Sequence, residues 1–170
     1  MSRLIADASA LVSLGIVTDD DPDPLALCLS RYEVVVPTAV IDELREIASY
    51  DDVHGHAASA VLDRVDAFTT QSVDLDAEFP LDDGENAAVT LANNLNAALF
   101  LCDEFNQLGL IHASLADTRL VTTPTLLSVL VRTEHLSAAD ARLLLDAISD
   151  ARSWGANSYV QRARSLLKEP

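Results

Sequence analysis

The sequence lacks several features that would assign it to a function class directly. It contains no run of about 18 apolar residues, the length that spans a bilayer, and Asp7 interrupts the apolar stretch at its start, which argues against a signal peptide. Its two cysteines, Cys28 and Cys102, show no CxxC spacing, so neither a zinc site nor a disulfide framework is predicted. We therefore expect a cytoplasmic protein with two buried free thiols.

Glycine-rich phosphate loops are also missing. Neither GxxxxGK[ST] nor GxGxxG occurs in the sequence, so binding of a nucleotide cofactor is poorly supported. The pair His54 and His56 resembles part of a metal site, but no cysteine or third histidine stands near it. This pair is more typical of a loop or a helix surface than of a zinc site.

Basic residues are scarce, and lysine is the scarcest. Eleven basic side chains, of which only Lys168 is a lysine, stand against 27 acids and give a net charge of −16. Such a surface is typical of a halophilic protein, because a Debye length of about 3 Å at 1 M salt screens its self-repulsion. The charge lowers the odds of a nucleic-acid partner without excluding one, since salt also weakens the attraction that basic patches exploit. An ordinary acidic, solvated surface is the alternative interpretation.

Short apolar strands alternate with amphipathic helices along the chain, which predicts an α/β fold with a parallel sheet covered on both faces. We predict a three-layer α/β/α, Rossmann-like domain over residues 1–170, with the helices of 133–170 as an extension packed on it. The predicted strands are 3–6, 34–36, 71–73, 98–102 and 120–122. The predicted helices are 8–15, 25–29, 38–48, 54–68, 82–95, 104–114, 125–132, 138–151 and 158–167.

Two acids directly follow predicted strands. Asp7 comes after the first strand and Asp103 after the strand at 98–102. If these strands are neighbours, both carboxylates project into the crevice at the carboxyl ends of the sheet, where ligands bind in doubly wound folds. Glu85, in the first turn of a helix, and Glu43, at the border of an apolar helix face, can point toward the same rim.

Each of these acids also has a structural explanation. Asp7 and Asp103 can cap the helices that they precede, Glu85 with Asp82 has the spacing of a capping box, and Glu43 can be an ordinary exposed acid. All four at matching points of an α/β chain nevertheless suggest a shared cation, because clustered carboxylates repel one another. Ligation by oxygen alone favours Mg²⁺ or Mn²⁺ over zinc.

Four segments of the sequence, taken in order, resemble the acidic blocks of the PIN domain: LIADASALVSLG, VVVPTAVIDELREIA, DDGENAAVTLA and ALFLCDEFNQ. The segment LVTTPTLLSVL is similar to the last strand and helix of the branch that includes VapC-type toxins. The resemblance covers about residues 3–132. It implies a parallel sheet with the first strand at its centre, an endoribonuclease that depends on Mg²⁺ or Mn²⁺, RNA as substrate, and an antitoxin as a candidate partner in a toxin–antitoxin pair.

The resemblance also implies roles for individual residues. Four positions match the metal-site and catalytic acids of the family, and three match supporting residues: Asp7, Glu43, Glu85 and Asp103, then Ser9, Glu104 and Thr123. The basic residues that often follow the fourth acid are replaced by Phe105, Asn106 and Gln107. This departure weakens the prediction of RNA binding more than the prediction of the metal site.

Two enzyme and signalling classes with acids at strand ends fit the sequence less well. A phosphohydrolase resembling the haloacid dehalogenases would carry a second Asp where Ser9 stands, and a response-regulator receiver would need a lysine after its last strand. A catalytically silent PIN-like module for binding or regulation is the main alternative, and the weak basic character favours it. Leu136, Trp154 and Tyr159 are candidates for a homodimer surface or for a cover over the core.

Overall fold

The structure is a computed structural model of the chain, and it describes residues 1–167. Within these residues five parallel strands form a sheet in the order β3-β2-β1-β4-β5. The strands are β1 (Arg3–Ala6), β2 (Glu33–Pro37), β3 (Thr69–Gln71), β4 (Leu99–Leu101) and β5 (Arg119–Val121). The chain runs outward from β1 to β3 and then returns to the other side of β1, so the strand order reverses between β1 and β4. This topology confirms the central position of the first strand.

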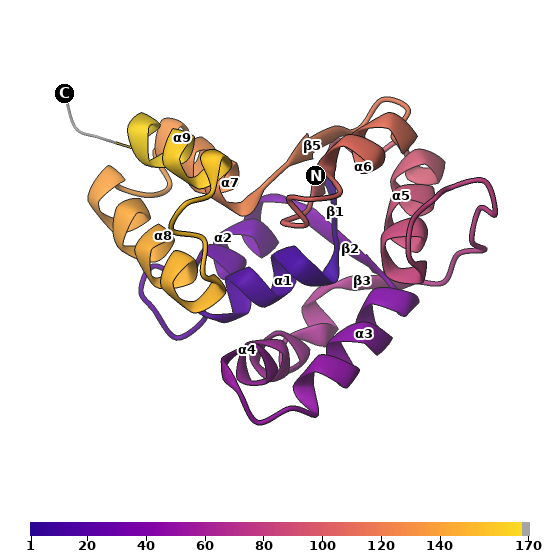
Figure 1. Cartoon of the computed structure of the whole chain (residues 1–170), viewed down its shortest axis with the longest axis horizontal. Helices are drawn as coiled ribbons and strands as arrows, with labels where there is room; N and C mark the ends of the chain where they lie inside the picture. Colours follow the sequence, from indigo (N-terminus) through magenta and orange to yellow (C-terminus); the bar gives the residue numbers. More distant parts are fainter. Residues whose placement is uncertain (168–170) are drawn as a thin grey trace.

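The helices cover both faces of the sheet and confirm the three-layer α/β/α architecture (Figure 1). Helices α5 and α6 pack on one face, and the other helices contribute to the core on the opposite face. The helices are α1 (Ala8–Gly15), α2 (Pro24–Arg31), α3 (Thr38–Ala48), α4 (Val53–Leu62), α5 (Asp83–Leu95), α6 (Leu108–Ser114), α7 (Thr123–Arg132), α8 (Ala138–Arg152) and α9 (Ser158–Leu166), with a 3-10 helix at Val65–Ala67.

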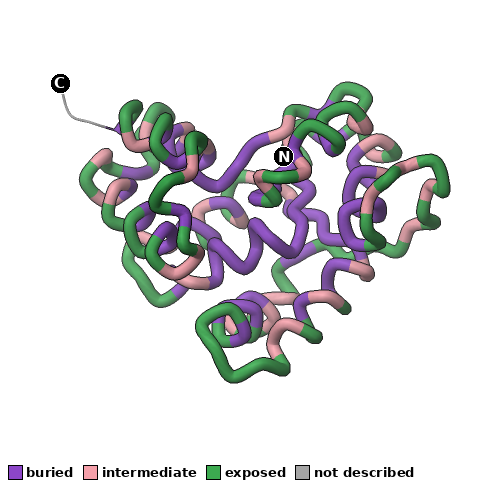
Figure 2. The backbone as a smooth tube through the Cα atoms, in the orientation of Figure 1, coloured by how far each residue is buried: buried purple, intermediate pink, exposed green. Residues whose placement is uncertain are grey.

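Alternating side chains of the central strands explain this sandwich. Leu4 and Ala6 face the larger core, whereas Ile5 faces the core beneath α5 and α6. Successive side chains of a strand point to opposite faces, so a strand covered on both sides must be apolar throughout. The buried part of the backbone accordingly runs through β1 and α1, at the centre of the molecule (Figure 2).

Several predicted elements differ from those observed in their bounds, and for three of them the structure shows where the pattern fails. The edge strand is Thr69–Gln71 instead of 71–73, and its three residues are exposed, so no apolar pattern marks it. The helix predicted at 54–68 ends at Leu62 and is followed by the 3-10 helix. The helix predicted at 104–114 begins only at Leu108, because residues 103–107 form turns closed by hydrogen bonds from the Phe105 and Gln107 N–H groups to Asp103 O and Glu104 O.

Helices α8 and α9 of the predicted extension pack against α7, beside α1 and α2 (Figure 1). Leu136 and Trp154 are buried in the larger core, so these two side chains cover the core and cannot form a dimer surface. Tyr159 is exposed. The last residues of the extension, 168–170, lie outside the described residues. Within residues 1–167, no helix has the length and apolarity needed to cross a membrane.

Candidate functional site

The ends of β1 and β4 bring Asp7 and Asp103 together at the carboxyl edge of the sheet. Ala6 pairs with Leu101 in the register of these strands, and the Asp7 N–H donates to Leu101 O at 3.2 Å. Both acids are buried, with exposed fractions of 3% and 4%. The strands β1 and β4 are neighbours, which is the condition under which the sequence places both acids in one crevice, and both acids lie where the strand order reverses.

Four hydrogen bonds fix Asp7 and connect it to the end of β4. Asp7 Oδ1 accepts from Ser9 Oγ at 2.8 Å and from the Ala10 N–H at 3.0 Å, and Oδ2 accepts from Cys102 Sγ at 3.0 Å. The Ser9 hydroxyl in turn accepts from the Asp103 N–H at 2.9 Å. Asp7 therefore does cap α1, as the structural explanation predicts, and Ser9 joins the two strand ends.

The Asp103 carboxylate is bound by a single residue of α7. Its Oδ1 accepts from the Thr123 N–H at 2.7 Å, and its Oδ2 accepts from Thr123 Oγ1 at 2.5 Å. Thr123 is fully buried at the start of α7. This pair anchors α7 to the end of β4 and uses part of the acceptor capacity of both carboxylate oxygens.

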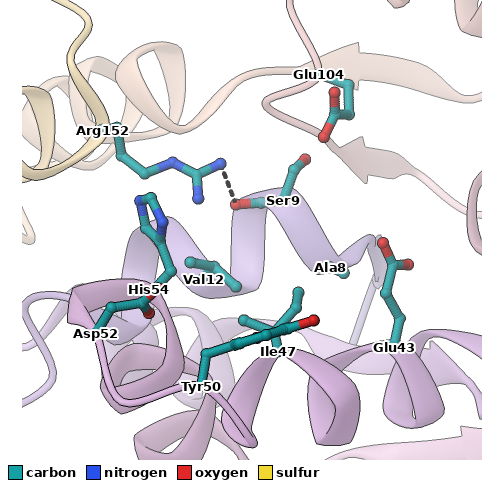
Figure 3. Close-up of a pocket in the computed structure, with 10 residues that line it drawn as sticks. All are labelled: Ala8, Ser9, Val12, Glu43, Ile47, Tyr50, Asp52, His54, Glu104 and Arg152. Atoms are coloured by element: carbon teal, nitrogen blue, oxygen red, sulfur yellow. Dashed lines mark hydrogen bonds between the residues drawn. The ribbon is translucent and has the colours of Figure 1, made fainter.

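Three glutamates form a rim above this buried pair: Glu43 from α3, Glu85 from α5 and Glu104 from the turn after β4. Figure 3 shows the carboxylates of Glu43 and Glu104 on the same side of the site. Among residues 1–167, no side chain or N–H group donates a hydrogen bond to a carboxylate of these three rim glutamates. By contrast, the carboxylates of Asp7 and Asp103 both accept hydrogen bonds from neighbouring residues.

Gly84 brings α3 and α5 together at the rim. A Cβ atom added at Gly84 would lie 2.4 Å from Glu43 Oε2, closer than any real contact. The absence of a side chain therefore lets the Glu43 carboxylate rest on the first turn of α5, the turn that carries Glu85. Asp82 caps this helix by accepting from the Glu85 N–H at 2.8 Å.

The electrostatics of the site couple its acids to one another. The pKa of Glu43 and that of Glu85 are both raised to about 7, chiefly by burial and then by the negative charges of Asp82, Asp7 and Glu104. Burial also raises the pKa of Asp7 to about 6, against the lowering effect of its hydrogen bonds. Burial raises the pKa of Asp103, although its bonds from Thr123 oppose the shift. In each case burial disfavours the negative form; neighbouring acids add to this at Glu43, Glu85 and Asp7, whereas the positive charge of Arg152 opposes it at Asp103.

The chemistry of this donor set fits a hard divalent cation, since every side chain at the rim offers carboxylate oxygen. The geometry is less complete: within residues 1–167 no three or more His, Cys, Asp or Glu side chains stand in positions that could hold a metal ion. A cation bound here would therefore require the carboxylates of the rim glutamates to move toward Asp7. The structure brings together the predicted acids of four separate segments, but it does not form a closed coordination shell from them.

A pocket of about 250 Å³ opens beside the rim. Figure 3 shows Arg152 and His54 at one end of this pocket and Glu43 and Glu104 at the other. Its lining residues are Ala8, Ser9, Val12, Glu43, Ile47, Tyr50, Asp52, His54, Glu104 and Arg152. On the other side of Glu43 lies a second hollow lined by acids and small residues: Ala39, Asp42, Glu43, Glu46, Asp82, Asp83 and Gly84. Glu43 therefore borders both hollows.

Four residues of this region were missed by reasoning from the sequence: Tyr50, Gly84, Cys102 and Arg152. Gly84 could have been found, because a glycine in the first helical turn between two acids indicates a close approach of another group. Arg152 could not, since it comes from the far end of the chain and shares no spacing with the acids. His54 was assigned to a loop or helix surface, and it is exposed near the start of α4.

Comparison with known proteins agrees with this architecture. A family model described as "DUF3368: PIN domain" matches residues 3–169. A solved structure of a PilT N-terminus domain protein, SSO1118 from the hyperthermophilic archaeon Sulfolobus solfataricus P2, superposes with a TM-score of 0.51. The alignment covers 75% of this chain and 92% of that one at 15% sequence identity, so it supports the fold alone. Among curated proteins, none matches this sequence.

Proposed function

The chain belongs to the PIN domain family, whose members are generally nucleases, and we propose that it is a divalent-metal-dependent endoribonuclease. The observation that carries the proposal is the rim of three glutamates, Glu43, Glu85 and Glu104. These carboxylates gather where the strand order reverses, receive no hydrogen bonds from the residues that the structure describes, and lie in one another's negative field. Such an arrangement is destabilising by itself and is relieved by a bound cation.

In this proposal the acids have two kinds of role. Asp7 and the rim glutamates hold Mg²⁺ or Mn²⁺, with Asp7 oriented by Ser9 and Cys102. Asp103 joins the end of β4 to the start of α7 through its bonds from Thr123, beside the metal ligands. Glu104, predicted as a supporting residue, takes a fuller part here because it adds to the field at both Glu43 and Glu85.

When bound, a divalent ion would polarise the phosphodiester and lower the pKa of an attacking water. The chain's own residues place the ion and the phosphate, and no nucleophilic side chain is required. Without the ion, the negative rim repels an RNA backbone. Metal binding and substrate binding are therefore expected to be linked, with RNA cleavage absent in EDTA.

A role as the toxin of a toxin–antitoxin pair follows only from the resemblance to VapC-type proteins. An antitoxin that covers the acidic site, a homodimer and a cytoplasmic location stay predictions of the same kind. We likewise propose that the chain forms a single domain, with residues 133–170 as an extension packed on it.

The experiment that tests the nuclease is cleavage of a pooled RNA with Mn²⁺, resolved on a gel and run beside an EDTA blank. Glu43→Gln removes one rim charge while keeping the size of the side chain, and cleavage should fall by at least about 100-fold. Glu33→Gln is the matched control, because Glu33 begins β2 at the opposite edge of the sheet and pairs there with Arg3. It should retain the activity of the unaltered chain.

The alternative is a catalytically silent module that binds RNA or regulates another protein. The open geometry of the acids within residues 1–167 favours it. If the unaltered chain binds RNA but shows no cleavage with either Mg²⁺ or Mn²⁺, the silent module replaces the nuclease.

A further inference from the structure

The pocket beside the rim has carboxylates at one end and, at the other, the guanidinium of Arg152 beside His54 and the helix-capping Asp52, and this arrangement points to a ligand. Its acidic end, with Glu43 and Glu104, belongs to the site described above, whereas its basic end carries Arg152 and His54 (Figure 3). We propose that this pocket binds one nucleotide of single-stranded RNA next to the scissile phosphate, with Arg152 on the neighbouring phosphate and Tyr50 against the base. The proposal rests on the nuclease function and describes how the site binds its substrate.

Arg152 is held in place but keeps donors for a ligand. It is the last residue of α8, and one guanidinium N–H group donates to Ser9 O at 3.4 Å. Its guanidinium carbon lies 5.7 Å from the ring centroid of Trp154, which is buried. A guanidinium has five N–H donors, so the remaining ones can bind a phosphate through two oxygens. Contacts on two sides orient the group and reduce the entropy lost on binding.

The floor of the pocket suits a flat, partly apolar group. Tyr50 is 61% exposed, and its ring extends along the pocket with the hydroxyl toward Glu43 (Figure 3). Ile47, Val12 and Ala8 supply apolar surface beside the ring. Exposed aromatic rings are the usual platforms for unpaired bases, whereas a base within a duplex has no free face to offer. The floor therefore favours single-stranded RNA.

The remaining polar residues of the pocket are compatible with a nucleotide. His54 is exposed beside Arg152 and can donate to a phosphate or a ribose hydroxyl. Asp52 also lines the pocket, but its carboxylate caps α4 by accepting from the Gly55 N–H at 2.7 Å. One of its oxygens is therefore directed toward the N-terminus of α4, and Arg152 supplies the phosphate contact at this end of the pocket.

The position of Arg152 compensates for the lack of basic residues after the fourth acid, Asp103. The residues after the fourth acid, Phe105 to Gln107, are not basic, so the expected grip on the phosphate backbone is missing there. Helix α8 lies beside α1 and brings Arg152 to the site from the C-terminal extension instead. One well-oriented arginine placed against the rim can supply a phosphate contact that the net charge of −16 would otherwise oppose.

The test compares Arg152→Gln with Arg132→Gln, which removes the same charge from an exposed position at the end of α7. In steady-state cleavage of a single-stranded RNA with Mn²⁺, Arg152→Gln should raise KM about tenfold with little change in kcat. Tyr50→Ala, at an exposed position where folding is not at risk, should raise KM by a similar factor. Arg132→Gln should leave both constants unchanged, and Mn²⁺ should stabilise all three variants as it stabilises the unaltered chain.

A second readout separates the failure of this proposal from the failure of the nuclease. Fluorescence anisotropy with a labelled five-nucleotide RNA, in Ca²⁺, measures binding whether or not cleavage occurs. If the unaltered chain does not cleave but Arg152→Gln and Tyr50→Ala still weaken binding, the pocket stands without the nuclease. If cleavage occurs and both variants match the unaltered chain in KM and anisotropy, the nucleotide lies elsewhere. Stronger binding of double-stranded than of single-stranded RNA, or no binding of either, would also overturn the proposal.

Discussion

Two sets of acids meet at the carboxyl edge of the sheet, and they differ in what stabilises them. Asp7 and Asp103 are buried, and each receives hydrogen bonds from neighbouring residues at 2.5 to 3.0 Å. The rim glutamates, Glu43, Glu85 and Glu104, receive none from residues 1–167 and lie in one another's field. Hydrogen bonds within the fold stabilise the inner pair, whereas residues 1–167 offer no such bonds to the carboxylates of the rim.

This difference separates two explanations that the sequence could not separate. An acid at the end of a strand can cap a helix, and Asp7 does so at α1 while Asp103 binds the start of α7. A cap of this kind contributes about 1 kcal/mol to stability and does not require a metal. The rim glutamates have no such structural contribution, and therefore they are the stronger sign of a function.

The largest effect expected from this comparison concerns two adjacent residues. Asp103→Ala leaves the buried N–H and hydroxyl of Thr123 without their acceptor, and should lower the free energy of unfolding by about 1–3 kcal/mol. Glu104→Ala removes an exposed charge from a repulsive cluster, and should change it by less than about 0.5 kcal/mol or raise it. Urea denaturation in EDTA measures both. Equal losses in the two variants would mean that inner and rim acids do not differ.

The second prediction alters the rim without changing any charge. Gly84→Ala places a methyl group where Glu43 Oε2 now lies, so the flexible carboxylate must move away from α5. RNA cleavage should fall about tenfold, whereas the free energy of unfolding should change by no more than about 1 kcal/mol, because alanine favours a helix over glycine. Gly109→Ala, in α6, is the control, since a methyl group there meets open space. A Gly84→Ala variant as active as this control would remove Glu43 from the site.

The fold could be predicted from the sequence wherever apolar residues followed a clear pattern along a strand or helix. The strand residues Leu4 to Ala6 and Leu99 to Leu101 are apolar because helices cover both of their faces, and that pattern is visible without a structure. The edge strand Thr69–Gln71 is exposed, so it carries no such pattern, and its position was wrong by two residues. The start of α6 was wrong because the turns after Asp103 depend on backbone hydrogen bonds that composition does not reveal.

The candidate site could be predicted only in part, for a related reason. Asp7 and Asp103 come together because neighbouring parallel strands end at the same edge, which is a consequence of strand order. The positions of Glu104 and Arg152 depend instead on a turn and on the packing of α8 beside α1. Long-range packing of this kind leaves no periodic signal, and these two residues are the ones for which we propose a role that the sequence did not indicate.

The third prediction uses pH. The folded pKa values of Asp7, about 6, and of Glu43 and Glu85, about 7, lie above the ordinary values of 3.8 and 4.5. The folded chain therefore binds more protons than the unfolded chain between about pH 4 and 7, and its stability should fall as pH rises through this window. Thermal melts from pH 5 to 8 in EDTA should show this slope. It should be shallower in Glu43→Gln and Glu85→Gln, and a slope as steep in both variants would contradict the coupling of the rim.

The smallest expected effects are changes in melting temperature with salt and with Mn²⁺. Together they distinguish a specific effect of the rim glutamates from the general acidity of the surface. A fall from 1 M to 0.1 M KCl lengthens the Debye length from about 3 Å to about 10 Å and exposes the net charge of −16 to itself. If the chain is halophilic, its melting temperature should fall by a few degrees, and it should fall equally in the unaltered chain and in Glu43→Gln, since one charge among many is changed.

Mn²⁺ at constant ionic strength should act differently. It should raise the melting temperature of the unaltered chain, because an ion that binds only the folded state stabilises it, and it should have little effect on Glu43→Gln. A Mn²⁺ response that survives in this variant would mean that the ion merely screens a uniformly acidic surface, and the rim would then have no special claim to a metal.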